Sequence, residues 1–290
     1  VVDPSQESLN IACQRALEVK YGNPNSTVSY IIDMPNNESI DICIIATSAN
    51  VRAMVTKQLF LTNKVKKIIF EKVLFQKIDD YNDVLQLLNK NESVGWVNCP
   101  RRLCTTYISL MEYLDQSKPI HMSVRGGSWG MACNSIHFLD IFSYLVGDSS
   151  LELRESKLDH ELKESKRAGF YETTGELKFS AGKHSIVVQS SRTENSEHVV
   201  SFENDQVKCV VNEGRGIWTL TIGDEQHQFK HTALPQSQLT GNYIDDLLTS
   251  NKCRLTPFAQ SCELHIPFIA ALLSHMSVVF NKKLDTCPIT

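Results

Sequence analysis

Three short apolar runs near the start of the chain, each followed by a stretch with helical spacing, constrain the fold more than any other feature of the sequence. The runs occupy residues 39–47 (SIDICIIAT), 65–70 (VKKIIF) and 94–99 (VGWVNC). The first is almost continuously apolar, which is typical of a parallel strand covered on both faces. Helical spacing follows at residues 51–62, 79–89 and 105–114. Strands that alternate with helices of this length predict a mostly parallel sheet with right-handed crossovers.

The first residues resemble the end of a strand followed by a helix. Val1 and Val2 precede Asp3, and residues 5–21 have helical spacing with Ser5 as the expected N-cap. This order is typical of the second half of a dinucleotide-binding βαβ unit, in which an acid about 20 residues after a glycine-rich loop binds the adenosine ribose. No such loop precedes Val1, so we expect the chain to lack the first strand and the phosphate-binding turn of this unit. Asp3 has an alternative role as the N-cap of the helix.

The pattern changes after residue 147. Residues 151–229 consist mainly of short alternating runs, at 176–179, 185–189, 199–202, 207–211 and 217–222. Such runs indicate antiparallel strands with one solvated face. Helices are expected at 243–248 and 258–279. The sequence therefore predicts an α/β domain over residues 1–100 and an α+β domain with a large, mostly antiparallel sheet over 101–290.

Two stretches are expected to meet and form a site. Glu71 and Lys72 follow the apolar strand 65–70, at the carboxyl edge where ligands bind in open α/β sheets. Residues 129–147 read as a helix, on which Cys133, His137, Asp140 and Tyr144 fall on one polar stripe. Lysine at a strand end and histidine on a helix face can together handle the proton of an alcohol.

Composition excludes several classes of partner. The net charge of −4 gives no basic footprint for nucleic acid or an anionic membrane. No apolar run approaches the roughly 20 residues of a membrane span, so we expect no membrane partner. The nine cysteines show no zinc-like spacing, so we expect no metal site. Free thiols in a reducing compartment are the simplest explanation of these cysteines, and the cytoplasm is the expected location.

Together these motifs resemble the glucose-fructose oxidoreductase/inositol dehydrogenase (Gfo/Idh/MocA) family. They are I-A-T ending at Thr47, E-K at Glu71 and Lys72, Arg102 after a strand, and H-x-x-D from His137 to Asp140. The resemblance covers nearly the whole chain. It implies a Rossmann domain followed by an open-faced sheet domain that also forms a homodimer or homotetramer. It also implies NAD(P)-dependent oxidation or reduction of sugars, cyclitols or nucleotide sugars.

The resemblance assigns roles residue by residue. It places Lys72 and His137 at the reacting carbon as catalytic residues. It implies that Arg102, Cys133, Asn134 and Asp140 contact the substrate, although Asp140 could equally cap or pair within the domain junction. The cofactor would contact Asp3, Thr47, Ser48, Asn50, Glu71 and Lys72, and the acid at Asp3 favours NAD over NADP.

The sequence departs from the family pattern at three places. Val73 replaces the proline after E-K, and Arg52 replaces the histidine of the turn that follows Thr47. Cys133 replaces an aspartate that the family often has four residues before the histidine, which removes one proton-handling group. The 129–137 stretch and the ending C-P-I-T resemble a subgroup associated with bacterial surface polysaccharides.

Two functional classes follow from these observations. The first is an NAD-dependent oxidoreductase of a sugar or nucleotide sugar, which the retained Lys72 and His137 favour. The second is a non-catalytic descendant that binds a dinucleotide or sugar as a sensor or scaffold, because fold does not fix function. Cys133 and the altered turn from Ser48 to Arg52 favour the second class.

Overall fold

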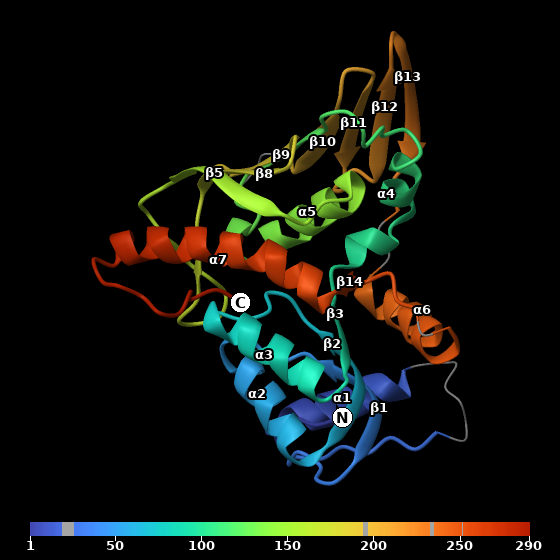
Figure 1. Cartoon of the computed structure of the whole chain (residues 1–290), viewed down its shortest axis with the longest axis vertical. Helices are drawn as coiled ribbons and strands as arrows, with labels where there is room; N and C mark the ends of the chain where they lie inside the picture. The colour runs from blue at the N-terminus through green and yellow to red at the C-terminus, as the bar shows by residue number, and fades with distance from the viewer. Residues whose placement is uncertain (19–25, 194–196, 233–234, 251) are drawn as a thin grey trace.

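The computed structural model describes residues 1–18, 26–193, 197–232, 235–250 and 252–290. It contains two main sheets, with helices packed between them, and a two-stranded sheet (Figure 1). The smaller sheet is formed by the first hundred residues and one later strand, and the larger sheet by residues beyond 120. The predicted fold class, a Rossmann-type parallel sheet followed by a large and mostly antiparallel sheet, is confirmed.

The smaller sheet has the strand order β1-β2-β3-β14. Its strands are β1 (Ser39–Ile45), β2 (Lys64–Phe70), β3 (Val94–Val97) and β14 (Thr256–Pro257). The first three are parallel, as predicted, and β14 is antiparallel to β3. Helices α2 (Ala49–Thr62) and α3 (Asp79–Lys90) are the crossovers. Ile68, Ile69 and Phe70 are fully buried, which explains the uninterrupted apolar end of β2.

The start of the chain lies beside this sheet. Helix α1 (Gln6–Leu17) begins after Ser5, whose side-chain oxygen accepts the backbone N–H of Ser8, so the predicted N-cap is confirmed. Asp3 accepts the N–H of Ser5 at 2.8 Å instead of capping the helix. Val2 forms a single parallel bridge with Ile31. The predicted end of this helix lies partly outside the described residues, and the absence of a first strand stays a prediction.

The larger sheet has eight strands in the order β13-β12-β11-β10-β4-β9-β8-β5. Its strands are β4 (His121–Gly126), β5 (Leu151–Leu158), β8 (Gly175–Ala181), β9 (His184–Ser190), β10 (Val199–Glu203), β11 (Val207–Asn212), β12 (Ile217–Ile222) and β13 (Glu225–Lys230). All neighbouring pairs are antiparallel except β4 and β9. A separate small hairpin joins β6 (Lys163–Glu164) to β7 (Tyr171–Glu172).

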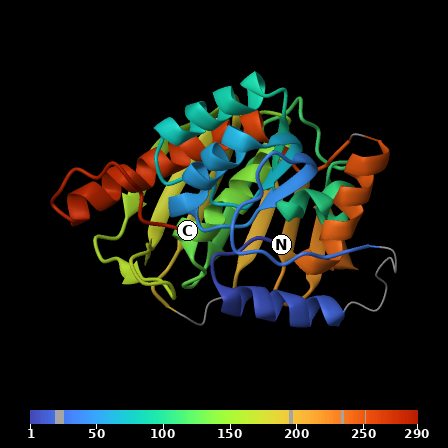
Figure 2. The same ribbon diagram turned by 90° about the horizontal axis from the view of Figure 1, so that it is seen from below.

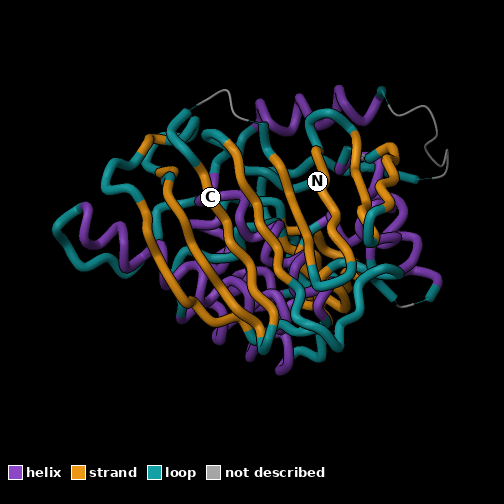
Figure 3. Tube along the Cα trace, turned by 90° about the horizontal axis from the view of Figure 1, so that it is seen from above, coloured by secondary structure: helices purple, strands orange, loops and turns teal. Residues whose placement is uncertain are grey.

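One face of the larger sheet carries no helix, as the view from above shows (Figure 3). The side chains on the other face of the sheet, such as Val124, Ile186 and Phe202, are fully buried. The alternate residues face outward, and Ser123 and Ser201 hydrogen-bond there at 2.8 Å. The alternation leaves a mixed rather than an apolar outer face, and the homodimer or homotetramer stays a prediction.

The layer between the sheets consists mainly of α5 (Met131–Val146) and α7 (Phe258–Val279). The view from below shows the N-terminal helices on the side of this layer that is away from the larger sheet (Figure 2). The 3-10 helix η1 (Pro100–Leu103) and α4 (Thr105–Leu110) follow β3, and α6 (Gln236–Thr249) covers a second apolar cluster against Ile69 and Trp96. Helix α7 is long and apolar enough to span a membrane by length and composition, contrary to the expectation that no run approaches that length. It packs against both sheets.

His265 of α7 ties this helix to the segment after β2. Its Nε2 accepts the backbone N–H of Leu74 at 3.2 Å, and its Nδ1 donates to the carbonyl oxygen of Ser261 at 2.8 Å. In a protonated ring Nε2 would carry a hydrogen and could not accept the N–H of Leu74. The ring is therefore neutral. Burial lowers the pKa of His265 from its ordinary 6.5 to about 3.

This pKa predicts a loss of stability in acid. Between pH 6.5 and about 3 the unfolded chain binds a proton at His265 that the folded chain does not, so the unfolding free energy falls as the pH falls. We expect His265→Gln to reduce the fall between pH 7.5 and 5.0 by about 2 kcal/mol. Urea unfolding of both proteins at the two pH values measures the difference. An identical fall in both proteins would contradict the assignment.

Candidate active site

The main cavity opens at the carboxyl ends of β1 and β2 and has a volume of about 690 Å³. Its walls come from the turn after β1, the end of β2, the start of α5 and the β6–β7 hairpin. Its lining residues include Thr47, Ser48, Arg52, Glu71, Lys72, Cys133, Asn134, Lys163, Lys166, Arg167 and Glu172. The two stretches that the sequence predicted to meet therefore do meet.

Lys72 joins the end of β2 to the first turn of α5. Its ammonium donates to the carbonyl oxygen of Cys133 at 3.0 Å and to Oδ1 of Asn134 at 3.3 Å. The peptide bond between Lys72 and Val73 is cis. Glu71, the preceding residue, accepts hydrogen bonds from Asn98 at 2.7 Å and Gln236 at 2.6 Å. Lys72 is thus held by α5, and Glu71 by the residue after β3 and by α6.

Arg52, which stands where the family has a histidine, holds two loops together. Its side chain is buried, and its guanidinium donates to the carbonyl oxygens of Thr47, Val73 and Leu74. Burial lowers the pKa of Arg52 to about 10, which leaves it charged at neutral pH. The arginine therefore clamps the turn after β1 to the segment after Lys72, and this fixes two walls of the main cavity.

His137 lies one helical turn after Cys133 but does not line the main cavity. Its Nδ1 is buried and has no hydrogen-bond partner among the described residues. Burial, together with the charges of Arg101 and Lys72, lowers its pKa well below 6.5. This direction favours the neutral form of the His137 ring, and its catalytic role stays a prediction.

Arg102 and Asp140 lie away from the main cavity and bind each other. Nε and Nη2 of Arg102 donate to the two carboxylate oxygens at 2.9 and 2.8 Å, and both residues are almost fully buried. Thr256 of β14 donates to the same carboxylate at 2.5 Å, and Gln260 of α7 accepts from Arg102 at 3.1 Å. The buried Arg102 therefore does not contact the main cavity as expected, and Asp140 has the alternative role of a pair within the junction of η1, α5, β14 and α7.

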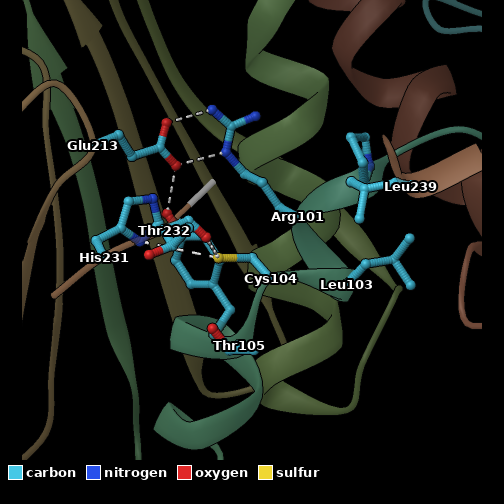
Figure 4. A pocket seen from close by; sticks show the side chains of 10 residues that line it. Arg101, Leu103, Cys104, Thr105, Glu213, His231, Thr232 and Leu239 are labelled. Carbon is cyan, nitrogen blue, oxygen red and sulfur yellow. Dashed lines mark hydrogen bonds and ion pairs between the residues drawn. The ribbon is translucent and has the colours of Figure 1, made fainter. Parts of the chain in front are cut away.

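Arg101, the neighbouring residue, lines a second cavity of about 370 Å³ between η1, α4, α6 and the ends of β11 and β13. Its guanidinium pairs with both carboxylate oxygens of Glu213 at 2.9 and 2.7 Å (Figure 4). It also lies 4.2 Å above the ring of Phe138 in α5. His231 lines this cavity too and places Nδ1 2.9 Å from the hydroxyl of Thr106. Arg101 therefore connects the second cavity to α5.

The expected cofactor residues divide into two groups. Thr47, Ser48, Glu71 and Lys72 line the main cavity, and Oγ1 of Thr47 is buried without a hydrogen-bond partner in the described chain. Asp3 and Asn50 lie outside the main cavity, and Asn50 accepts a hydrogen bond from Ser48 at 2.7 Å. No group of three or more metal-binding side chains occurs among the described residues.

Sequence reasoning missed the β6–β7 hairpin as a wall of the main cavity, and Glu172 is one of its lining residues. It belongs to the two-residue strand β7, and its Oε2 accepts the backbone N–H of Ala132 in the first turn of α5 at 2.8 Å. The C-terminal segment holds this strand, because Tyr171 donates its N–H to the carbonyl oxygen of Pro288 at 2.8 Å. No periodicity or motif marks Glu172 in the sequence.

Comparison with known proteins identifies the fold. No protein-family model matches the sequence, and no curated protein sequence matches it significantly. Among solved structures, UDP-N-acetylglucosamine 3-dehydrogenase GnnA from Acidithiobacillus ferrooxidans superposes with a TM-score of 0.66 at 10% identity, over 99% of this chain and 88% of that chain. A Gfo/Idh/MocA family oxidoreductase from Vibrio cholerae gives 0.66 at 12% identity, over 97% and 90%.

An oxidoreductase from Agrobacterium radiobacter, solved with NAD⁺, L-tartaric acid and magnesium, gives a TM-score of 0.65 at 13% identity, over 92% of this chain and 85% of that chain. At these identities the similarity shows the shared fold.

The buried pair at the junction carries a prediction. Asp140→Asn leaves the Arg102 cation buried without a countercharge, and we expect a loss of about 3–5 kcal/mol in unfolding free energy. Glu152→Gln, which removes an exposed pair with Arg154, should cost at most about 1 kcal/mol. Urea unfolding measures both losses, and equal losses would contradict the role of the pair.

Proposed function

We propose that this chain, which has the two-domain fold of the Gfo/Idh/MocA oxidoreductases, transfers hydride between a nicotinamide cofactor and a secondary alcohol or ketone of a sugar or nucleotide sugar. The observation that carries the proposal is the meeting of Lys72 with the first turn of α5 in one cavity at the carboxyl ends of β1 and β2. Ligands of open α/β sheets bind at this edge.

The residues present fit the nicotinamide end of such a cofactor. The unpartnered Oγ1 of Thr47 is a buried polar atom at the cavity that a ligand amide would satisfy, and Ser48 adds a second hydroxyl. Bound there, the nicotinamide would accept or supply hydride. The 290 residues contain no glycine-rich phosphate loop, so they do not account for the pyrophosphate. The acid at Asp3 supports NAD rather than NADP.

The chain itself supplies position and charge to the reaction. The ammonium of Lys72, fixed by Cys133 and Asn134, is a hydrogen-bond donor for the oxygen of the reacting carbon. In reduction the same donor polarises a carbonyl. Neutral His137 stands one turn further along α5, outside the cavity wall.

Cationic side chains at the rim support an anionic substrate. Lys163, Lys166 and Arg167 of the β6–β7 hairpin line the main cavity, and Arg167 is near enough to Arg52 to disfavour its charge. Phosphate groups of a nucleotide sugar match such a rim. GnnA, one of the structural relatives, is described as acting on UDP-N-acetylglucosamine. A place in surface-polysaccharide synthesis remains part of the proposal.

The second candidate is a protein that binds a dinucleotide or sugar without turnover. Two observations favour it, the thiol at position 133 and the pKa of His137 well below neutrality. Both remove proton-handling capacity from the places where the family resemblance expects it. For either function we propose a cytoplasmic protein that forms a homodimer or homotetramer through its open sheet, which light scattering would measure.

The catalytic assignment predicts a loss of turnover without a loss of fold. We expect Lys72→Met in the full-length protein to lower kcat by at least about 100-fold, because the methionine keeps the length of the side chain and removes the donor. The assay follows NADH absorbance with UDP-N-acetylglucosamine and a panel of other sugars and nucleotide sugars. Lys77→Met, an exposed lysine of the same loop, is the control.

NADH binding, measured by fluorescence, separates the two candidates. Saturable binding with turnover supports the oxidoreductase. Saturable binding of NADH without turnover of any sugar would favour the binding protein. No binding of NADH would contradict the oxidoreductase and also a binding protein whose ligand is a dinucleotide.

The rim predicts a preference for phosphorylated substrates. We expect Lys166→Ala combined with Arg167→Ala to raise KM for a nucleotide sugar by about tenfold, equal to about 1.4 kcal/mol of binding, with little change in kcat. The same variant should leave KM for the corresponding free sugar unchanged. Lys90→Ala, on the exposed side of α3, is the matched control. An equal rise for both substrates would contradict the phosphate role.

A further inference from the structure

The first turn of α5 receives a carboxylate from another part of the chain. Glu172 reaches it from β7, and its Oε2 accepts the N–H of Ala132 at 2.8 Å. Its second oxygen, Oε1, lies on the same side, 3.5 Å from where a Cβ on Gly130 would be. The carboxylate therefore stands beside Cys133, in a first turn of α5 that has no acidic residue of its own.

Cys133 cannot supply the missing proton-handling group. Burial, and then the charge of Glu172, raise the pKa of the Cys133 thiol to about 12. The thiol therefore stays protonated at neutral pH, and it donates to the carbonyl oxygen of Gly130 at 3.5 Å. A group that never loses its proton in the working range cannot act as a general base.

Glu172 has the surroundings of a base. It is partly buried and lines the main cavity together with Lys72, whose charge acts directly on it. Burial raises its pKa, although the hydrogen bonds from Cys133 and Ala132 and the charge of Lys72 oppose the rise. On its other side Glu172 borders a cavity of about 330 Å³ that Glu161, Lys163 and Arg192 also line.

We propose that Glu172 is the carboxylate that exchanges the substrate proton in this site, a role that rests on the proposed function. In oxidation the O–H bond of the alcohol breaks and its proton passes to Glu172. The electron pair left on oxygen forms the second bond of the carbonyl, while hydride leaves carbon for the oxidised nicotinamide, which is thereby reduced. Lys72 holds the oxygen, and protonated Glu172 releases its proton through the cavity.

The position of Glu172 depends on the C-terminal segment. Tyr171 donates its N–H to Pro288, and Gln76, in the loop after Lys72, donates to the carbonyl oxygen of Ile289 at 2.9 Å. One short segment therefore sets β7 and the loop after Lys72 relative to each other. The base and the lysine are thereby held at the same cavity although 100 residues separate them in the sequence.

The test uses Glu172→Gln in the full-length protein. Glutamine still accepts the N–H of Ala132 through its carbonyl oxygen, so the fold is kept while the base is lost. With the substrate turned over by the wild type, we expect kcat to fall at least about 100-fold, with the NADH dissociation constant and the melting temperature unchanged. Glu161→Gln, which loses only an exposed pair with Arg192, should keep wild-type kcat.

A second variant separates a base from a structural role. Cys133→Asp in the Glu172→Gln background places a carboxylate on the neighbouring residue, and we expect it to recover at least tenfold in kcat. Carboxyl ¹³C NMR of the protein without ligands, with Glu172→Gln to identify the resonance, should show that Glu172 titrates above 4.5.

The outcomes distinguish this proposal from the proposed function. An active wild type with kcat within threefold in Glu172→Gln overturns the role of Glu172 and leaves the oxidoreductase standing. Titration of Glu172 at or below 4.5, or no recovery in a folded Cys133→Asp double variant, also overturns it. A wild type that binds NADH and turns over no sugar overturns the oxidoreductase and this role together.

Discussion

The buried ion pair between Arg102 and Asp140 is the constraint on which the rest of the structure depends. It joins the end of the smaller sheet to α5, and through Thr256 and Gln260 it reaches β14 and α7. A bidentate pair of this kind tolerates little movement, because any separation leaves a charge in the core without water. It therefore fixes where α5 begins relative to β2, and Lys72 can meet the first turn of that helix only in this arrangement.

Most of the smaller sheet and both site stretches could be predicted from the sequence. Apolar runs that end in Glu71 and Lys72 locate a strand and its edge, and helical spacing from Met131 to Val146 locates the facing helix. The strand β4 was missed because its residues, H-M-S-V-R-G, carry only two apolar side chains. Its parallel partner β9 lies some 60 residues further along the chain, and no local pattern specifies that pairing.

The remainder of the site could not be predicted because it depends on long-range contacts. Glu172 enters the main cavity from a two-residue strand that is held by the C-terminal segment. From the sequence, the altered turn that ends at Arg52 favours a non-catalytic protein, whereas in the structure Arg52 binds three carbonyl oxygens of two loops. Arg102 and Asp140 matched the family motif in sequence, yet their buried pairing gives them a structural place. The order of the motifs correctly predicted that the end of β2 and the start of α5 lie close together. Only the structure distinguished the residues that line the main cavity from those that hold its walls in place.

The anchoring of Lys72 has a consequence for how this site can change during evolution. One of its two partners is the main-chain oxygen of Cys133, an atom that every amino acid provides at that place. The lysine can therefore keep its orientation while the side chain at 133 is exchanged freely.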